Sequence, residues 1–160
     1  MAVHKNLLLL FLLFPNLIFG SQIGAASNST IEILAEDIIK TSEDTYLMGV
    51  KFRLDPGWHT YWINPGDSGE KASFEWKLPE GVKISNPKWP SPEIIPYPPL
   101  MTYGYNEEVT VLFNLTVERD LLSSQQIFLK SNWLACEDVC LPPVSYTHLR
   151  AHETLRYLVC

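Results

Sequence analysis

Two cysteines, Cys136 and Cys140, are the residues of this sequence whose type and spacing most clearly indicate chemistry. Residues four apart on a straight strand lie about 13 Å from each other. A disulfide needs Cα atoms within about 7 Å. The chain must therefore turn at Glu137 and Asp138 if the two sulfurs are to bond. We predict this disulfide, with Cys160 uninvolved.

A bond across so short a gap would stabilise the fold only modestly. Chain entropy gives roughly 2 kcal/mol for a loop of about five residues, against roughly 3 kcal/mol for fifteen. The pair therefore favours a redox role, and a local structural clasp is the alternative.

The charges near the cysteines along the chain are negative. Glu137 and Asp138 lie between them, and Lys130, six residues before Cys136, is the nearest basic residue. Carboxylates disfavour a thiolate, so the pKa of a free thiol here should be ordinary or raised. The pattern predicts a passive pair, whose disulfide is attacked by the low-pKa thiol of a partner.

One histidine, His59, lies in the aromatic segment GWHTYW. Alternation along a strand puts His59 and Tyr61 on the face opposite to the tryptophans. We interpret the tryptophans as core residues and His59 as a residue of the other face. A Cys/Cys/His metal site with Met101 is the alternative, but it has few ligands. We expect no metal, no other cofactor, no Ser-His-Asp set and no phosphate loop.

Seven segments are predicted to be strands, because apolar and β-branched residues alternate and turn signals separate the runs. They are Thr30–Leu34, Tyr46–Leu54, Trp58–Ile63, Ser73–Leu78, Val82–Ser85, Val109–Val117 and Gln126–Leu134. Only Ile33–Lys40 and Arg119–Gln125 hint at helix. The pattern predicts an all-β domain, a sandwich or a barrel, of which the sandwich is commoner.

The stretch Trp89–Tyr105 carries five prolines and many large apolar side chains. Proline removes a donor from a strand ladder, so we predict an extended loop or an edge segment. An exposed apolar loop would form a patch of the kind that marks an interaction site. We therefore expect Pro96–Tyr105 to cover the cysteine pair, with Gly104 as a pivot.

The first 26 residues resemble a secretory signal peptide. His4 and Lys5 precede an apolar run from Leu7 to Phe19, and small residues follow. The run is shorter than the roughly 20 residues that span a membrane. An uncleaved anchor is the alternative. Export would place the cysteines where disulfides form.

The last residues have a different character. Val144–Thr154, VSYTHLRAHET, resembles the translated read-through of a sequencing adaptor, and Tyr157–Cys160 matches its closing part. We therefore assign residues 144–160 to a non-native tail and expect it to have no packed structure and no role. The domain is then Ser27–Pro143, and the natural chain would continue beyond it.

This domain is acidic. It holds 9 Lys and Arg against 17 Asp and Glu, a net charge of −8. Such a charge argues against a nucleic-acid partner and against binding to an anionic membrane surface.

Three segments together resemble one known family. They are GWHTYWINPGDSG (Gly57–Gly69), PYPPLMTYGY (Pro96–Tyr105) and WLACEDVCLPP (Trp133–Pro143). They are similar to the N-terminal domain of DsbD-like and ScsB-like thiol:disulfide interchange proteins. The resemblance implies an immunoglobulin-like β-sandwich in which Cys136 and Cys140 exchange. It also implies a cap loop over them, formed by Met101, Thr102, Tyr103, Gly104 and Tyr105.

The function that this resemblance implies is the transfer of reducing equivalents. The domain would receive them from a thioredoxin-like and membrane-embedded relay and pass them to oxidised periplasmic acceptor proteins. The acceptor would be a disulfide isomerase, a cytochrome-maturation protein or a copper-stress factor. The fragment would be the delivery domain of a protein-disulfide reductase, tethered through a membrane domain beyond this chain and incomplete alone.

The cysteine spacing departs from the best-studied members, which separate the two residues by five, whereas here three intervene, as in the ScsB-like branch. The alternative function is a secreted β-sandwich binding module, related to copper, in which the cysteines form a local disulfide.

Overall fold

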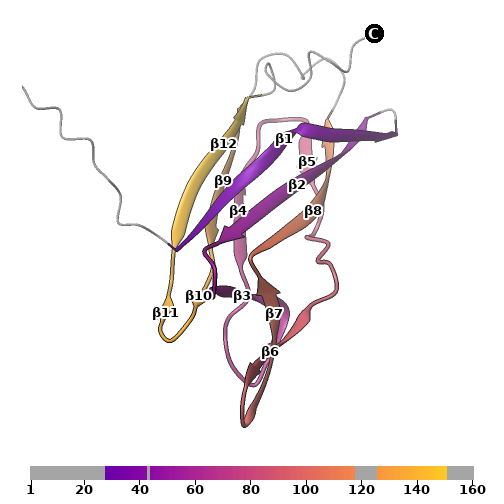
Figure 1. Cartoon of the computed structure of the whole chain (residues 1–160). Coiled ribbons are helices and arrows are strands. Elements are labelled where there is room, and N and C mark those ends of the chain that lie inside the picture. Colours follow the sequence, from indigo (N-terminus) through magenta and orange to yellow (C-terminus); the bar gives the residue numbers. More distant parts are fainter. Residues whose placement is uncertain (1–27, 43, 118–125, 151–160) are drawn as a thin grey trace, which may run out of the picture.

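The computed structural model describes residues 28–42, 44–117 and 126–150, and these residues form strands and turns without a helix (Figure 1). No helix long and apolar enough to cross a membrane occurs in this part of the chain. The predicted signal peptide lies outside the described residues.

Twelve strands follow one another in the described residues. They are β1 (Ser29–Ser42), β2 (Thr45–Leu54), β3 (His59–Gly66), β4 (Ser73–Lys77), β5 (Val82–Ile84), β6 (Glu93–Tyr97), β7 (Leu100–Asn106), β8 (Glu108–Val117), β9 (Gln126–Asn132), β10 (Ala135–Cys136), β11 (Cys140–Leu141) and β12 (Val144–Arg150). Each predicted strand is present. The segment Ile33–Lys40, with its weak helical signal, belongs to β1, and Arg119–Gln125 lies outside the described residues.

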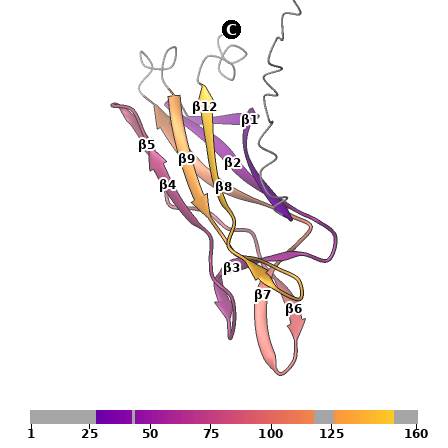
Figure 2. The same ribbon diagram turned by 90° about the vertical axis from the view of Figure 1, so that its left-hand side faces the viewer.

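The strands form three antiparallel sheets. Their orders are β1-β2-β8-β5, β12-β9-β4 and β11-β10-β3-β7-β6. The first two face each other as a sandwich, and the third projects from one end of it (Figures 1 and 2). We refer to the third as the end sheet. The predicted all-β sandwich is confirmed.

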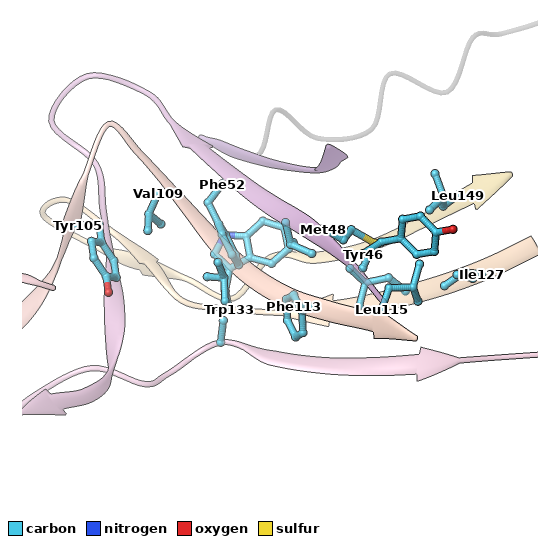
Figure 3. Packing of buried hydrophobic residues seen from close by; sticks show 14 of the residues in the cluster. Tyr46, Met48, Phe52, Tyr105, Val109, Phe113, Leu115, Ile127, Trp133 and Leu149 are labelled. Carbon is cyan, nitrogen blue, oxygen red and sulfur yellow. The ribbon is translucent and has the colours of Figure 1, made fainter. Parts of the chain in front are cut away.

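Alternating side chains of β2 and β8 build the core between the two facing sheets. Met48, Val50 and Phe52 are fully buried. Rings from both layers meet: Phe74 contacts Phe52 and Phe113, and Trp76 contacts Phe113, with centroids 5.2–6.1 Å apart. Figure 3 shows this apolar row, which runs from Leu149 at one end to Tyr105 at the other.

The proline-rich stretch was predicted to be an extended loop or an edge segment. Most of it forms a hairpin of β6 and β7, so the prediction of a loop is wrong, whereas the prediction of an edge is correct for β6. Pro96 lies on β6, which has a neighbour on one side only, and an edge strand tolerates a missing donor. The turn holds Pro98 and Pro99. Strand β7 contains no proline, and it therefore pairs on both sides, with β3 and with β6.

Residues 144–150 form β12, and the expectation that they lack packed structure is wrong. They pair with β9 from Val144↔Asn132 to Arg150↔Gln126. A backbone ladder needs no particular side chains, and the alternation of this segment turns Leu149 inward, where it is 6% exposed. Its resemblance to an adaptor translation is a separate matter and stays a prediction. Residues 151–160 lie outside the described part.

Candidate redox site

The two cysteines form the predicted disulfide. Cys136 ends β10, Cys140 begins β11, and the two are register partners with Cα atoms 4.1 Å apart. The turn between them is closed by a hydrogen bond in which the backbone N–H of Glu137 donates to the carbonyl oxygen of Val139, at 3.2 Å. The predicted turn at Glu137 and Asp138 is therefore confirmed.

The two sulfur-bearing residues differ in exposure. Cys136 is 1% exposed, whereas Cys140 is exposed to solvent. The sheet order explains the difference, because β10 lies between β3 and β11 while β11 is the edge of the end sheet. Cys140 is therefore the more accessible of the two residues.

His59 and Tyr61 lie beside this disulfide. His59 is the register partner of Cys136 across the β3–β10 ladder. Its Nε2 lies 3.3 Å from the Tyr61 hydroxyl, and that hydroxyl lies 3.9 Å from Cys140 Sγ. The predicted face of His59 and Tyr61 is correct. No basic residue lies near the cysteines along the chain, but folding places the imidazole of His59 beside them.

Burial keeps both of these side chains neutral at neutral pH. It lowers the pKa of His59 below its ordinary value of 6.5. Burial, with a smaller contribution from the nearby Tyr97, raises the pKa of Tyr61 above 10. The neutral imidazole can then accept a hydrogen bond from the phenol.

A pocket of about 160 Å³ opens next to the disulfide. The hairpin supplies Ile95, Tyr97 and Thr102 to its lining, and the disulfide and the turn after Cys136 supply the opposite part. Ile95 and Thr102 are register partners, so they share one face of the hairpin. The hairpin and the turn project from the same end of the molecule (Figure 2). The charged residues that line the pocket in the described structure are acidic, Glu137 and Asp138.

Alternation along β7 separates the five predicted cap residues. Thr102 faces the pocket and is 1% exposed. Met101, Tyr103 and Tyr105 point to the other face of the hairpin, and Tyr105 belongs to the core. Its ring stacks on Trp89, and its hydroxyl donates to the carbonyl oxygen of Pro90 at 2.7 Å.

Gly104 is paired on both sides, with Tyr61 of β3 and Glu93 of β6, and the β3–β7 ladder shifts register next to it. A Cβ at this position would overlap the carbonyl oxygen of Thr60 on the neighbouring strand. The glycine therefore allows β7 and β3 to approach closely, and the predicted pivot does not match this geometry.

The segment Asp67–Gly69 braces the site. The Met101 N–H donates to the Asp67 carboxylate, and the Asp67 N–H donates to the Met101 carbonyl oxygen, both at 2.9 Å. Gly69 has a φ of 97°, and any Cβ there would overlap the ring of Tyr61. The ring of Tyr61 thus packs against a backbone position that has no room for a Cβ and therefore requires glycine.

Three residues beside the disulfide, Tyr61, Ile95 and Tyr97, were expected to have structural or covering roles and not to belong to the site. The shared face of Tyr61 and His59 was a usable signal. The position of Ile95 and Tyr97 depends on hairpin pairing, which was not predicted from the sequence. No group of three or more His, Cys, Asp or Glu in the described residues is placed to hold a metal ion.

The sequence of this chain matches one known protein family over most of its length. The family model for the N-terminal part of the thiol:disulfide interchange protein DsbD matches residues 32–151. The chain belongs to this family. The matched DsbD N-terminal region includes Cys136, Cys140, the β6–β7 hairpin and β12.

Two solved structures share the fold. The N-terminal periplasmic domain of ScsB from Proteus mirabilis superposes with a TM-score of 0.60 at 23% identity, covering 78% of this chain and 47% of that one. The chain therefore spans about half the length of that protein domain. The reduced DsbD N-terminal domain of Neisseria meningitidis gives a TM-score of 0.50 at 17% identity, covering 75% and 83%. The immunoglobulin-like β-sandwich is thereby confirmed. A comparison with curated protein sequences gave no match.

Proposed function

We propose that this DsbD-type domain exchanges its Cys136–Cys140 disulfide with a thioredoxin-like donor and then reduces oxidised periplasmic proteins. The observation that supports this most is the unequal exposure of the two cysteines at the end of the sandwich. A structural clasp has no need of an accessible sulfur, whereas a relay needs one sulfur for attack and one as leaving group.

Reduction of the domain proceeds in two exchanges. A donor thiolate attacks Cys140 Sγ, the bond to Cys136 breaks, and Cys136 leaves with the electron pair and takes up a proton. The donor's second thiolate then attacks its own sulfur in the mixed disulfide and releases Cys140, which is protonated. The domain has gained two electrons and two protons, and the donor has become a disulfide.

Delivery runs in the opposite direction. The Cys140 thiolate attacks the acceptor disulfide, and Cys136 resolves the mixed disulfide. Exported, periplasmic action accords with the ScsB relative, whose N-terminal domain is periplasmic. Tethering through a membrane domain beyond this chain, and an acceptor among disulfide isomerases, cytochrome-maturation or copper-stress proteins, belong to the same proposal.

The experiment uses the full chain with Cys160→Ser, so that a third thiol does not interfere. The oxidised protein is mixed with reduced thioredoxin as probe, quenched with acid, alkylated and weighed. We expect complete reduction of the Cys136–Cys140 bond and a fall in the melting temperature of roughly 5–10 °C, since the short loop is worth about 2 kcal/mol. A bond that persists under excess thioredoxin, yet yields to dithiothreitol, would contradict the relay.

Two matched variants test the direction of attack. Cys136→Ser leaves the exposed thiol, and Cys140→Ser leaves the buried one. The probe is a thioredoxin that lacks its second cysteine and carries its first as a mixed disulfide with 2-nitro-5-thiobenzoate. Only Cys136→Ser should displace 2-nitro-5-thiobenzoate, which leaves as the thiolate, and form a mixed disulfide with thioredoxin. Equal trapping by both variants would mean that the sulfurs are equally accessible.

A further inference from the structure

Delivery of electrons requires that Cys140 become a thiolate, and its charged neighbours oppose this. The thiolate is the attacking species in thiol–disulfide exchange. Glu137 and Asp138, which line the same pocket, disfavour a second negative charge. A group that removes the proton as the attack occurs would lower this barrier.

His59 and Tyr61 are placed to do so. The contacts run in series from Cys140 Sγ to the Tyr61 hydroxyl, 3.9 Å, and from that hydroxyl to His59 Nε2, 3.3 Å. The two rings lie edge to face, 5.3 Å apart. The ring of Tyr61 packs directly against the backbone of Gly69, which limits its movement on that side.

We propose that His59, acting through the hydroxyl of Tyr61, accepts the proton of Cys140 when this thiol attacks and returns it when the thiolate is released. This inference rests on the proposed function and assigns residues to its proton transfers. The Cys140 S–H gives its proton to the Tyr61 oxygen while the Tyr61 O–H gives its own to His59 Nε2. The products are a thiolate, a neutral phenol and an imidazolium.

The opposite charges of these products lie at the two ends of a short chain of contacts, where they stabilise each other. The reverse shift protonates Cys140 when a donor reduces the disulfide. The lowered pKa of His59 fits the role of acceptor, because a neutral imidazole has a free lone pair at neutral pH.

Other titratable or charged groups lie on the strands and the turn around His59. They are Cys136 and Cys140 on β10 and β11, Glu137 and Asp138 in the turn, and Tyr97 and Glu93 on β6. The facing residue of β7, Asn106, is neutral and donates to Glu93. Compared with these neighbours, the imidazole of His59 is the group whose ordinary pKa lies nearest neutrality.

The test is alkylation of the reduced full chain by iodoacetamide between pH 5 and pH 9, with peptide mass mapping to separate Cys140 from Cys136 and Cys160. The reagent needs no partner, so the result does not depend on whether thioredoxin exchanges with the domain. Thioredoxin exchange is measured in parallel, and its failure alone would count against the proposed function only.

The variants are His59→Gln, which keeps a hydrogen-bond acceptor, and Tyr61→Phe, which keeps the ring on Gly69. At pH 7 we expect each to alkylate Cys140 about 10-fold more slowly than the unchanged chain, a modest fraction of what acid–base catalysis can contribute. Their pH profiles should move toward that of an isolated thiol, whose pKa is about 8.5. Wild-type rates and profiles in either folded variant would overturn the proposal.

The double variant separates a relay from two independent structural effects. Groups that act in series are non-additive, so the double change should slow alkylation no more than either single change. Multiplied losses would contradict the relay. Tyr146→Phe and His148→Gln, both on β12, are matched controls and should alkylate as the unchanged chain does.

Discussion

Exposure at the level of single residues determines what this disulfide can do. Cys140 lies at a sheet edge, and Cys136 is enclosed between two strands. The same edge places the Tyr61 hydroxyl against the accessible sulfur and not against the buried one. In the proposed exchange, the residue that a partner attacks is therefore also the residue beside the proposed proton acceptor.

Tyr105 illustrates how a residue beside the site can serve the core. Its hydroxyl bonds to Pro90 and its ring stacks on Trp89. Tyr105→Phe should lower the free energy of unfolding by about 1 kcal/mol, since one hydrogen bond is lost. Tyr105→Ala should lower it by about 3–5 kcal/mol. Urea denaturation measures both, and a negligible loss in Tyr105→Ala would contradict the core position.

The same tyrosine predicts a pH dependence at alkaline pH. Burial raises the pKa of Tyr105 to about 12. The unfolded chain loses this proton near pH 10, whereas the folded domain keeps it, so stability should fall as pH rises from 10 to about 12. The difference in unfolding free energy between pH 9 and pH 11 should be smaller in Tyr105→Phe. Equal differences in the two proteins would contradict this origin.

The β6–β7 hairpin lines the pocket beside the disulfide. Its pocket face carries Ile95, Tyr97 and Thr102, while Ile94 points away and is 61% exposed. The brace from Asp67 to Met101 ties the hairpin to the segment beneath Tyr61. That the hairpin covers the disulfide thus stays a proposal. The side chains that would cover it are Ile95, Tyr97 and Thr102, and of these only Thr102 was among the predicted cap residues.

Removing pocket-facing side chains should speed reduction by a small thiol. Tyr97→Ala and Ile95→Ala are expected to raise the rate of reduction by dithiothreitol several-fold, because they widen the approach to the sulfurs. Ile94→Ala, on the opposite face, is the matched control and should leave the rate unchanged. Circular dichroism checks that each variant is folded. Equal rates in all three would mean that the hairpin does not restrict access.

At the scale of the whole molecule, β12 closes the sheet that packs on β2 and β8. Its Leu149 is buried in the same cluster as Ile127 (Figure 3). Without β12, strand β9 would become an exposed edge and its inward side chains would lose a neighbour. A segment that resembles an adaptor translation therefore contributes to the stability of this chain.

Ending the chain after Pro143 should consequently lower the melting temperature. Loss of the buried Leu149 alone is worth about 2–5 kcal/mol, so we expect a fall of at least about 5 °C. A chain ended after Arg150 retains the whole strand and is the control. A melting temperature unchanged by the cut at Pro143 would show that β12 adds nothing to the fold.

The sequence by itself determined most of the elements of this protein and their faces. Period-two alternation identified seven strands and put His59 and Tyr61 on one side, because successive side chains of a strand point to opposite faces. The short cysteine gap, together with the predicted signal peptide, predicted the disulfide. The shared motifs with DsbD-like proteins predicted the sandwich.

Only the tertiary structure decided which strands pair. Alternation says nothing about a strand's partner or register, and those depend on contacts between residues distant in sequence. The pairing of Cys136 with His59 brought an imidazole to an otherwise acidic site. The pairing of β7 with β3 sets Tyr105 opposite Thr60, with its side chain in the core, and the pairing of β12 with β9 gave structure to a segment whose sequence suggested none.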